Sequence, residues 1–306
     1  MRRLANGLIV VCCLLLLANT AQAGGLVRIT ERVYAYVDAQ DTSPANSFGA
    51  NAGIIIGENG IAVVDTLVSA KEAQRFLRDI AAISGKPVKY VINTHHHLDH
   101  AFGNAEFARL GATIIAHAAD GSNMRQQAAN VLANAGQYGL TPEDLAGTEI
   151  ACPDLTFSDR LQLDLGGVEV ELIYPAPSHS AGSILVHLPG EKVVFAGDVL
   201  FTDVHPYMGE GDISGWQRTL DLLAGLEAEV IIPGHGPLSN QKDVAEMKEY
   251  IAIFDRKAKE LAAKGADDPE AAVAEMKKNL PERTRGEWLI GANLKIKYLA
   301  GSPPKP

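Results

Sequence analysis

Long apolar runs are scarce in this sequence of 306 residues. The longest, Leu8–Ala18, has 11 residues, whereas a helix needs about 20 to cross a bilayer. A basic start, MRR, precedes this run and the small-x-small sequence AQA follows it, which is typical of a secretory signal peptide over residues 1–23. We therefore expect an exported mature protein that begins near Gly24, is periplasmic or secreted, and keeps no stable membrane anchor. An uncleaved anchor is the alternative.

Cysteine is also rare, with three residues in the chain. Cys12 and Cys13 lie inside the apolar run without a small residue before them, which argues against a lipoprotein. Cleavage leaves only Cys152, so an internal disulfide is excluded, and stability must come from an ordinary core, for which about 280 residues suffice. Because Cys152 precedes a proline in the loop-like stretch EIACPDL, we interpret it as a small apolar filler rather than a nucleophile.

Positive charge is limited as well. Without the expected signal peptide the chain has 25 basic and 37 acidic side chains, a net charge of −12. Nucleic acid and anionic membrane surfaces are poor partners for such a chain, because binding them needs basic patches. The charge balance therefore favours a small-molecule substrate.

Apolar runs alternate with turns along the chain in a consistent order. Period-two alternation and Gly-containing turns predict strands and hairpins, and period-3.6 patterns predict helices. Each half contains a hairpin, a further strand, a helix and a last strand, which favours two mixed sheets packed face to face with helices outside. The main expected elements are a strand at 26–38, a hairpin at 52–65, helices at 68–83, 101–110 and 120–138, a hairpin at 161–172, and helices at 213–226 and 241–261.

The helix expected at 241–261 has one apolar face, at alternating spacings of three and four. Packing on its own domain is the main interpretation, and a homodimer through this helix is the alternative. The C-terminal residues 300–306, AGSPPKP, are expected to form a disordered tail.

Histidine is concentrated in the stretch NTHHHLDH, directly behind an apolar strand. In an extended segment residues i and i+2 point the same way, so His95 and His97 can hold one ion, whereas His96 points away. Asp99 and His100 follow as the chain turns into a helix, and they offer an oxygen and a nitrogen to a second position. Imidazole and carboxylate without thiolate favour zinc over iron or manganese.

Three more ligand-type residues follow apolar runs elsewhere. They are His179 in SHSAGS, Asp198 in FAGDVLF and His235 in PGHG. Strand ends commonly converge to build a site, so we expect these side chains to meet the histidine cluster. His117 and His187 lie within strand patterns and are interpreted as structural.

The motifs THHHLDH, SHSAGS, FAGDVLF and PGHG, in this order, resemble those of the metallo-β-lactamase fold superfamily. The resemblance implies an α/β fold, a four-layer αβ/βα sandwich of two mixed β-sheets flanked by helices, with a hydrolase domain over residues 24–299 that includes C-terminal helices. It also implies two zinc ions at a sheet edge. By position, the first zinc would be held by His95, His97 and His179, and the second by Asp99, His100 and His235, with Asp198 bridging both and Asp65 orienting a ligand.

The resemblance further implies a hydrolytic reaction. Paired zinc ions lower the pKa of bound water to about 7, so that a metal-bridging hydroxide can open an ester, lactone, thioester or β-lactam carbonyl. Asp99 is the candidate catalytic residue, since it could guide the nucleophile or carry a proton to the leaving group. Two alternatives are a non-catalytic periplasmic metal- or ligand-binding protein and an iron-dependent sulfur oxidoreductase. The diiron branch of the superfamily usually carries Glu at the position of His97, which disfavours the second alternative.

Two segments are expected to line the substrate pocket. Ala39–Gly53 is long, small and polar, and we predict a mobile flap with Phe48 at its apolar tip. The stretch after the predicted bridging acid places Phe201, His205, Tyr207 and Met208 near the mouth. Lactamases that resemble this region carry Lys at the position of Phe201, while GDVLF resembles the GDTLF of glyoxalase II-like enzymes.

Overall fold

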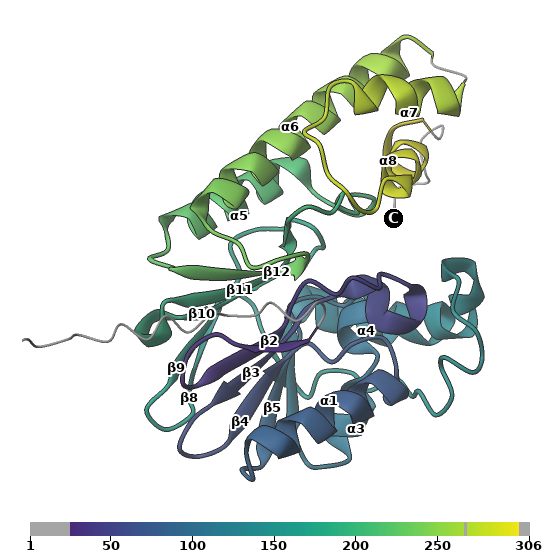
Figure 1. Cartoon of the computed structure of the whole chain (residues 1–306). Helices are drawn as coiled ribbons and strands as arrows, with labels where there is room; N and C mark the ends of the chain where they lie inside the picture. Colours follow the sequence, from purple (N-terminus) through teal and green to yellow (C-terminus); the bar gives the residue numbers. More distant parts are fainter. Residues whose placement is uncertain (1–24, 266–267, 300–306) are drawn as a thin grey trace, which may run out of the picture.

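Two β-sheets lie face to face at the centre of the computed structural model, which describes residues 25–265 and 268–299 (Figure 1). The strands are β1 Leu26–Arg28, β2 Val33–Tyr36, β3 Ala52–Ile56, β4 Ile61–Val64, β5 Val88–Ile92, β6 Thr113–His117, β7 Leu155–Phe157, β8 Arg160–Asp164, β9 Glu169–Ile173, β10 Leu185–Leu188, β11 Val193–Phe201 and β12 Val230–His235. One sheet contains β1 to β7 in sequence order, and the other has the order β12-β11-β10-β9-β8. Both are mixed: β4 to β7 pair in parallel, as do β11 and β12, and the remaining pairs are antiparallel.

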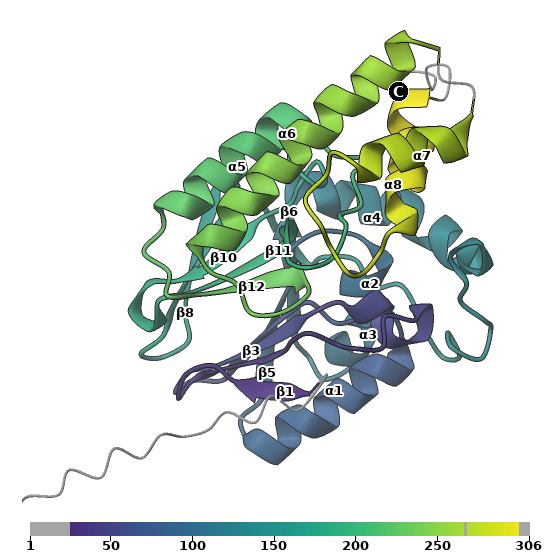
Figure 2. The same cartoon turned by 45° about the horizontal axis from the view of Figure 1, so that its top comes forward.

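Helices cover the outer faces of both sheets (Figure 2). They are α1 Ala70–Ile83, α2 Leu98–Ala101, α3 Asn104–Ala108, α4 Ala118–Ala133, α5 Ile213–Gly225, α6 Gln241–Ala263, α7 Pro269–Lys277 and α8 Trp288–Asn293, with short helical turns η1 Pro44–Gly49, η2 Ala135–Tyr138, η3 Pro189–Glu191 and η4 Leu294–Leu299. Helices α1, α3 and α4 lie beside the seven-stranded sheet, and α5 and α6 cover the five-stranded one. The predicted α/β four-layer sandwich is confirmed.

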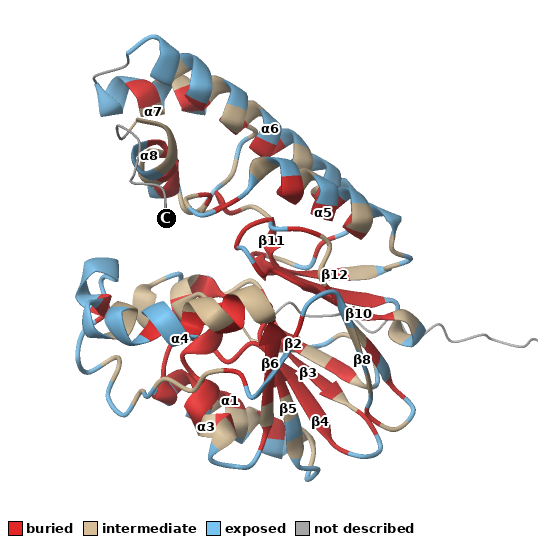
Figure 3. Cartoon of the chain, turned by 180° about the vertical axis from the view of Figure 1, so that it is seen from behind, coloured by how far each residue is buried: buried red, intermediate tan, exposed pale blue. Residues whose placement is uncertain are grey.

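The core has separate layers between the sheets and under the helices. Alternate residues of the strands, such as Ile55 and Leu172, meet between the two sheets, while their neighbours face the helices. Under α1, Phe76 and Ile80 pack on the outer face of the seven-stranded sheet. Figure 3 shows that buried residues follow the strands and the inner faces of the helices. This layering leaves one edge of the sandwich for the polar side chains of the site.

The apolar face predicted for 241–261 is used within the chain. Val244, Met247, Ile251 and Phe254 of α6 are fully or almost fully buried in the core layer that α6 shares with α5 and β11. The helix begins with a capping box at Asn240. The Asn240 side chain accepts from Lys242 N, and the backbone N–H of Asn240 donates to the carboxylate of Asp243. In this structure the apolar face of α6 therefore packs against the rest of its own chain.

Several expected elements differ in their bounds. The strand expected at 26–38 is two strands, β1 and β2, because Thr30 Oγ1 accepts from the backbone N–H groups of Arg32 and Val33 and turns the chain. The helix expected at 101–110 is the shorter α3, and the separate α2 ends at Ala101. Gly103 lies between the two, where a Cβ would lie 2.0 Å from the carbonyl oxygen of Thr66. Strand β7 was not expected from the sequence. The predicted signal peptide and C-terminal tail lie outside the described residues, and within residues 25–265 and 268–299 no helix combines the length and the apolar character needed to cross a membrane.

Candidate metal centre

Side chains from both sheets meet at one edge of the sandwich, and they include every residue predicted as a metal ligand. They are His95 and His97 behind β5, Asp99 and His100 in α2, His179 between β9 and β10, Asp198 within β11, and His235 at the end of β12. Each is buried except His97, which is partly exposed toward a cavity. The chain supplies them from four separate segments, so the cluster exists only in the folded protein.

Three histidines and Asp198 form the first group. His97 Nδ1 lies 3.1 Å from His95 Nε2 and 2.9 Å from His179 Nε2. Asp198 Oδ2 lies 3.3 Å from His179 Nε2 and 3.8 Å from His95 Nε2. The ligand atoms of this group all lie within 4.8 Å of one another, which suits one ion.

Asp99, His100 and His235 form the second group beside the first. His235 Nε2 lies 3.3 Å from Asp99 Oδ2 and 3.4 Å from His100 Nε2. The other carboxylate oxygen of Asp198, Oδ1, lies 3.1 Å from His100 Nε2 and 3.5 Å from His235 Nε2. The Asp198 carboxylate thus turns one oxygen to each group.

Hydrogen bonds on the far side of the rings identify the atoms that point into the centre. His179 Nδ1 lies 3.1 Å from the carbonyl oxygen of Tyr207, and His100 Nδ1 lies 2.9 Å from a carboxylate oxygen of Asp65. A carbonyl or carboxylate oxygen accepts here, so each Nδ1 carries a proton, and Nε2 is the atom that can bind a cation once the ring is neutral. Among the described residues Asp198 Oδ1 is buried without a hydrogen-bond partner. Converging nitrogen lone pairs and carboxylate oxygens fit a pair of divalent cations.

Asp65 is the central residue of this outer layer. It is buried at the end of β4, where it accepts from the backbone N–H of Thr94 at 2.8 Å and from Thr94 Oγ1 at 2.7 Å in addition to His100. Its φ of 61° lies in the left-handed region, which costs a non-glycine residue about 1–2 kcal/mol. Three hydrogen bonds offset that cost, so the backbone is held in this conformation to orient His100.

Burial and charge set the protonation of the cluster. Burial lowers the pKa of His179 to about 3 and holds that of His95 well below its usual value, so both rings are neutral, as ligation requires. Burial alone would raise the pKa of Asp198, but the adjacent imidazoles, His100 first, hold the pKa well below the usual range. The carboxylate of Asp198 is therefore ionised. Burial would lower the pKa of His100, but Asp198, Asp99 and Asp65 raise it well above its usual value, so in the absence of a metal ion this ring is protonated.

Glu210 is a part of the site that sequence reasoning missed. Its Oε2 lies 3.6 Å from His97 Nε2, the ring nitrogen that faces away from the first group, and 3.6 Å from His96 Nε2. Burial would raise the pKa of Glu210, but the adjacent ring of His97, and then that of His96, lowers that pKa to about 2. His96 is held by Asp120 on its other side, at 3.3 Å. The one available signal was an acid in the glycine-rich loop MGEGD soon after the predicted bridging residue.

Glycines allow the two strands that carry Asp198 and His235 to approach each other. Asp198 lies inside β11 rather than beyond the end of a strand, and His235 is the last residue of β12. Strand β11 has an irregular register on both sides of Gly197, whose φ is 49°. A Cβ on Gly234 would lie 1.9 Å from Asp198 Oδ1, so a larger residue there would displace the carboxylate. The irregularity turns Asp198 into the centre without ending the strand.

A cavity of about 570 Å³ opens above the ligands. Of the side chains predicted to contact substrate, Phe48, Phe201 and Tyr207 line it. The ring of Phe201 stacks on that of His235, with centroids 5.2 Å apart and planes 5° from parallel. Phe201 therefore also holds the ring of His235, a predicted metal ligand, in its orientation. These residues come from η1, β11 and the loop after it.

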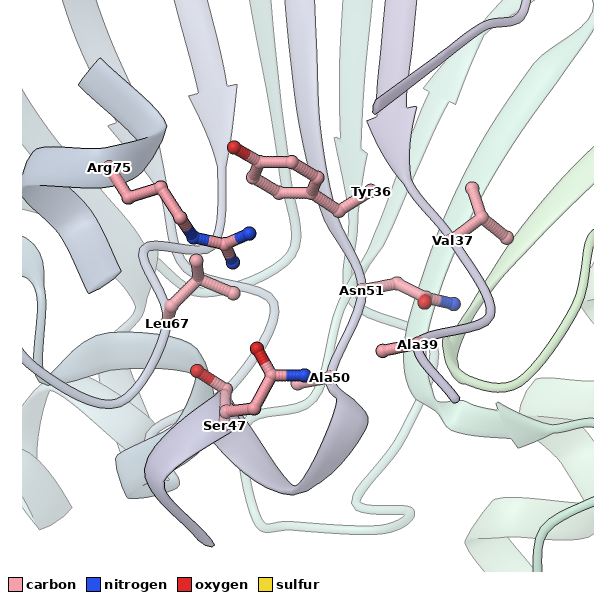
Figure 4. Close-up of a pocket in the computed structure, with 9 residues that line it drawn as sticks. Tyr36, Val37, Ala39, Ser47, Ala50, Asn51, Leu67 and Arg75 are labelled. Atoms are coloured by element: carbon pink, nitrogen blue, oxygen red, sulfur yellow. The ribbon is translucent and has the colours of Figure 1, made fainter. Parts of the chain in front are cut away.

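The segment 39–53, predicted as a mobile flap, is tied to the sheet edge. Ser47 Oγ accepts from Val68 N at 3.0 Å, and Asn51 Nδ2 donates to the carbonyl oxygens of Pro233 and Gly236 at 2.8 and 3.0 Å. Behind it, a cavity of about 20 Å³, room for about one water, separates Ser47 and Asn51 from Arg75 of α1 (Figure 4). The segment is a bonded wall of the larger cavity, with Phe48 facing inward.

His205 is not brought to the cavity. Nor is Met208, which is fully buried in the core layer with α5 and α6. The side chain of His205 is buried, its Nδ1 lies 2.7 Å from the Tyr250 hydroxyl, and its backbone N–H donates to the carbonyl oxygen of Arg285. The residue follows a turn at Asp203, whose φ is 59°, and the turn points the next side chains toward α6. A histidine in a loop gives no periodic signal of its direction, so the sequence could not place it.

The burial of His205 predicts a pH dependence of stability. Burial, with Arg283 nearby, lowers the pKa of His205 to about 4, whereas a histidine in an unfolded chain titrates near 6.5. As the pH falls, the unfolded chain takes up this proton first, so stability should decrease between about pH 6.5 and 4, by about 2 kcal/mol. His205→Asn keeps an acceptor for Tyr250 but does not titrate. Urea unfolding at several pH values should show the wild type losing more stability than this variant, and parallel curves would contradict the assignment.

Comparison with known proteins agrees with this geometry. The family model described as "Metallo-beta-lactamase superfamily" matches residues 46–235. The α subunit of 2,4-dinitroanisole O-demethylase from Nocardioides sp. (strain JS1661) is 30% identical over 183 residues, 59% of this chain and 51% of that protein. A linear primary-alkylsulfatase from Pseudomonas sp. (strain ATCC 19151) is 28% identical over 228 residues, 63% of this chain and 43% of that protein. The chain thus spans about half the length of these curated relatives.

A solved structure shows the same fold. A metallo-beta-lactamase from Pontibacter korlensis superimposes with a TM-score of 0.61 at 19% sequence identity, covering 74% of this chain and 98% of that one. Members of this superfamily are mostly metal-dependent hydrolases. The matched residues 46–235 make up more than half of the chain and include all seven clustered His and Asp side chains, and the chain therefore belongs to the metallo-beta-lactamase superfamily.

Proposed function

We propose that this chain is an exported dinuclear zinc hydrolase that opens an ester, thioester, lactone or β-lactam carbonyl. The observation that carries the proposal is the position of Asp198, whose two carboxylate oxygens face two different ligand groups. When bound, a pair of zinc ions supplies an activated water near neutral pH and polarises the carbonyl oxygen. Nitrogen and oxygen donors without thiolate support zinc as the metal.

The chain's own residues would position the reactants. Asp99 belongs to the second group and also lines the cavity, and its Oδ2 is 3.3 Å from His235 Nε2. Burial would raise the pKa of Asp99, but His100 and His235 lower it, so the carboxylate is ionised and able to accept a proton. Its place on the cavity wall supports a role in moving that proton to the leaving group.

The charges of the cavity favour neutral substrates. Among the described residues that line it, the single cation is Arg285, and its guanidinium is already 2.8 Å from Asp38 and 3.5 Å from Asp203. An anionic substrate would also meet Glu210 close to the ligands. We therefore place neutral esters and thioesters before carboxylate-bearing β-lactams. Two relatives are named for acting on a dinitroanisole and on linear alkyl sulfates. Both names support a substrate with an apolar part, although an alkyl sulfate is itself an anion, so they do not bear on the preference for neutral substrates.

The direct test measures turnover against metal content. Zinc-loaded protein should hydrolyse p-nitrophenyl or thiol esters without oxygen, a chelator should lower the rate at least about 100-fold, and added zinc should restore it. A lactone and a chromogenic cephalosporin complete the panel. Two bound zinc ions with no turnover of any compound would favour the non-catalytic binder, and iron with oxygen consumption would favour the sulfur oxidoreductase.

A further inference from the structure

The cavity beside the predicted metal ligands extends well past them, to residues of α4, α8 and η4. At one end it reaches His97, Asp99 and His235, and at the other it opens to solvent between side chains of α8 and η4. Its volume of about 570 Å³ lies within the range of small-molecule sites, but only one end holds reactive groups. The rest of the space must therefore be matched to the part of the substrate that does not react.

That remaining space is mainly apolar. Ala128 and Val131 of α4 line one side, and Leu289 and Ala292 of α8 line the other. Helices α4 and α8 come from opposite halves of the chain and face each other across this cavity (Figure 1). A methylene chain lying between them would be removed from water on both sides.

Exposed apolar surface is concentrated at the same opening. The described residues expose six large apolar side chains, and three of these line the cavity: Trp288 at 67%, Ile296 at 46% and Tyr138 at 41% exposure. Gathered apolar surface of this kind marks a binding site more often than scattered single residues do. The opening is thus continuous with the apolar wall.

The wall is part of the fold rather than a loose appendage. Asn293 of α8 is fully buried, its Oδ1 accepts from Met208 N at 2.7 Å, and its Nδ2 donates to the carbonyl oxygen of Pro206 at 2.8 Å. Both partners lie in the loop that follows β11. A wall held in this way loses little freedom when a ligand binds, which favours affinity.

We infer that this cavity binds a long, uncharged apolar chain of the substrate, so that the enzyme prefers long-chain neutral esters or thioesters to short ones. The inference rests on the proposed function for the reactive end of the substrate. For the non-reacting part of the substrate, the inference rests on the apolar lining of the cavity. The one cation of the described lining, Arg285, is already paired with Asp38, so the lining offers no free positive charge to an anionic group. The wall between α4 and α8 is then the part of the site that determines specificity.

A series of p-nitrophenyl esters from acetate to decanoate tests the inference on the zinc-loaded protein. Each buried methylene should raise kcat/KM about three- to fourfold until the cavity is filled. Ala292→Phe narrows the channel from α8, and Val131→Phe narrows it from α4. Each should lower the decanoate-to-butyrate ratio of kcat/KM at least about tenfold, whereas Ala82→Phe, an exposed position on α1, should leave that ratio unchanged.

Binding of N-phenyl-1-naphthylamine, a neutral apolar fluorophore, separates failure of the inference from failure of the proposed function. Suppose that no ester is hydrolysed, but that the wild type binds the probe and Ala292→Phe or Val131→Phe does not. The apolar binding site is then supported, and the proposed hydrolase function is contradicted. If esters are hydrolysed without a rise along the series, or both narrowing variants behave as Ala82→Phe does in turnover and probe binding, the inference is overturned.

Discussion

Asp198→Asn is expected to lower kcat/KM on the best ester about 1,000-fold, equivalent to about 4 kcal/mol of transition-state stabilisation. The carboxylate turns Oδ2 to the group of His179 and Oδ1 to the group of His100. An amide has the same shape but only one oxygen, so it can complete one group and presents an NH₂ to the other. Bound zinc should accordingly fall from about two ions per chain toward one.

Metal analysis after gel filtration and steady-state kinetics on the same samples would measure both effects. Asp159→Asn makes the same change on an exposed side chain far from the cluster and should keep full zinc content and activity. Retention of two zinc ions and near-normal kcat/KM in Asp198→Asn would show that this residue does not bridge the two groups.

Asp65→Asn should weaken zinc binding about 10- to 100-fold, although this residue does not face the ion positions. Asp65 accepts from His100 Nδ1, from Thr94 N and from Thr94 Oγ1. An asparagine has one accepting oxygen for these three donors, so at least one bond is lost and the His100 ring is less well oriented. Asparagine is chosen because it tolerates the left-handed conformation at this position better than alanine.

Competition with a chelating dye would give the zinc affinity of each variant. Asp203→Asn is the matched control: its φ of 59° is similar, but its carboxylate bonds to Thr284 and Arg285 rather than to a ligand. Equal zinc affinity of wild type and Asp65→Asn would contradict the orienting role. Equal weakening in both variants would assign the effect to the backbone conformation instead.

Local spacing was enough to predict much of this protein. The alternation of His95 and His97 in an extended segment places both side chains on one side, and the structure has them in one group. The hairpin predicted at 161–172 and the apolar face predicted at 241–261 appear as β8–β9 and α6, since period-two and period-3.6 patterns follow directly from backbone geometry. The fold class followed from the order of these patterns and from the four motifs.

For polar residues in loops, the tertiary structure decided where each side chain points. His205 and Tyr207 lie two positions apart in one loop, yet one side chain packs on Tyr250 and the other lines the cavity. Glu210 can be assigned to the site only because it lies beside His97, which is more than a hundred residues earlier in the chain. No local period encodes such directions, because contacts with distant elements determine them.

The sequence by itself determined the ligand types, the strand and helix patterns and the family. The tertiary structure alone decided which Asp198 oxygen faces which ligand group, and which wall borders the cavity. That wall, α8, lies more than 150 residues from α4 along the chain, and its apolar residues read as ordinary core residues in the sequence. An apolar side chain is the same in sequence whether it faces a core or a ligand, and only the fold shows which of the two it contacts.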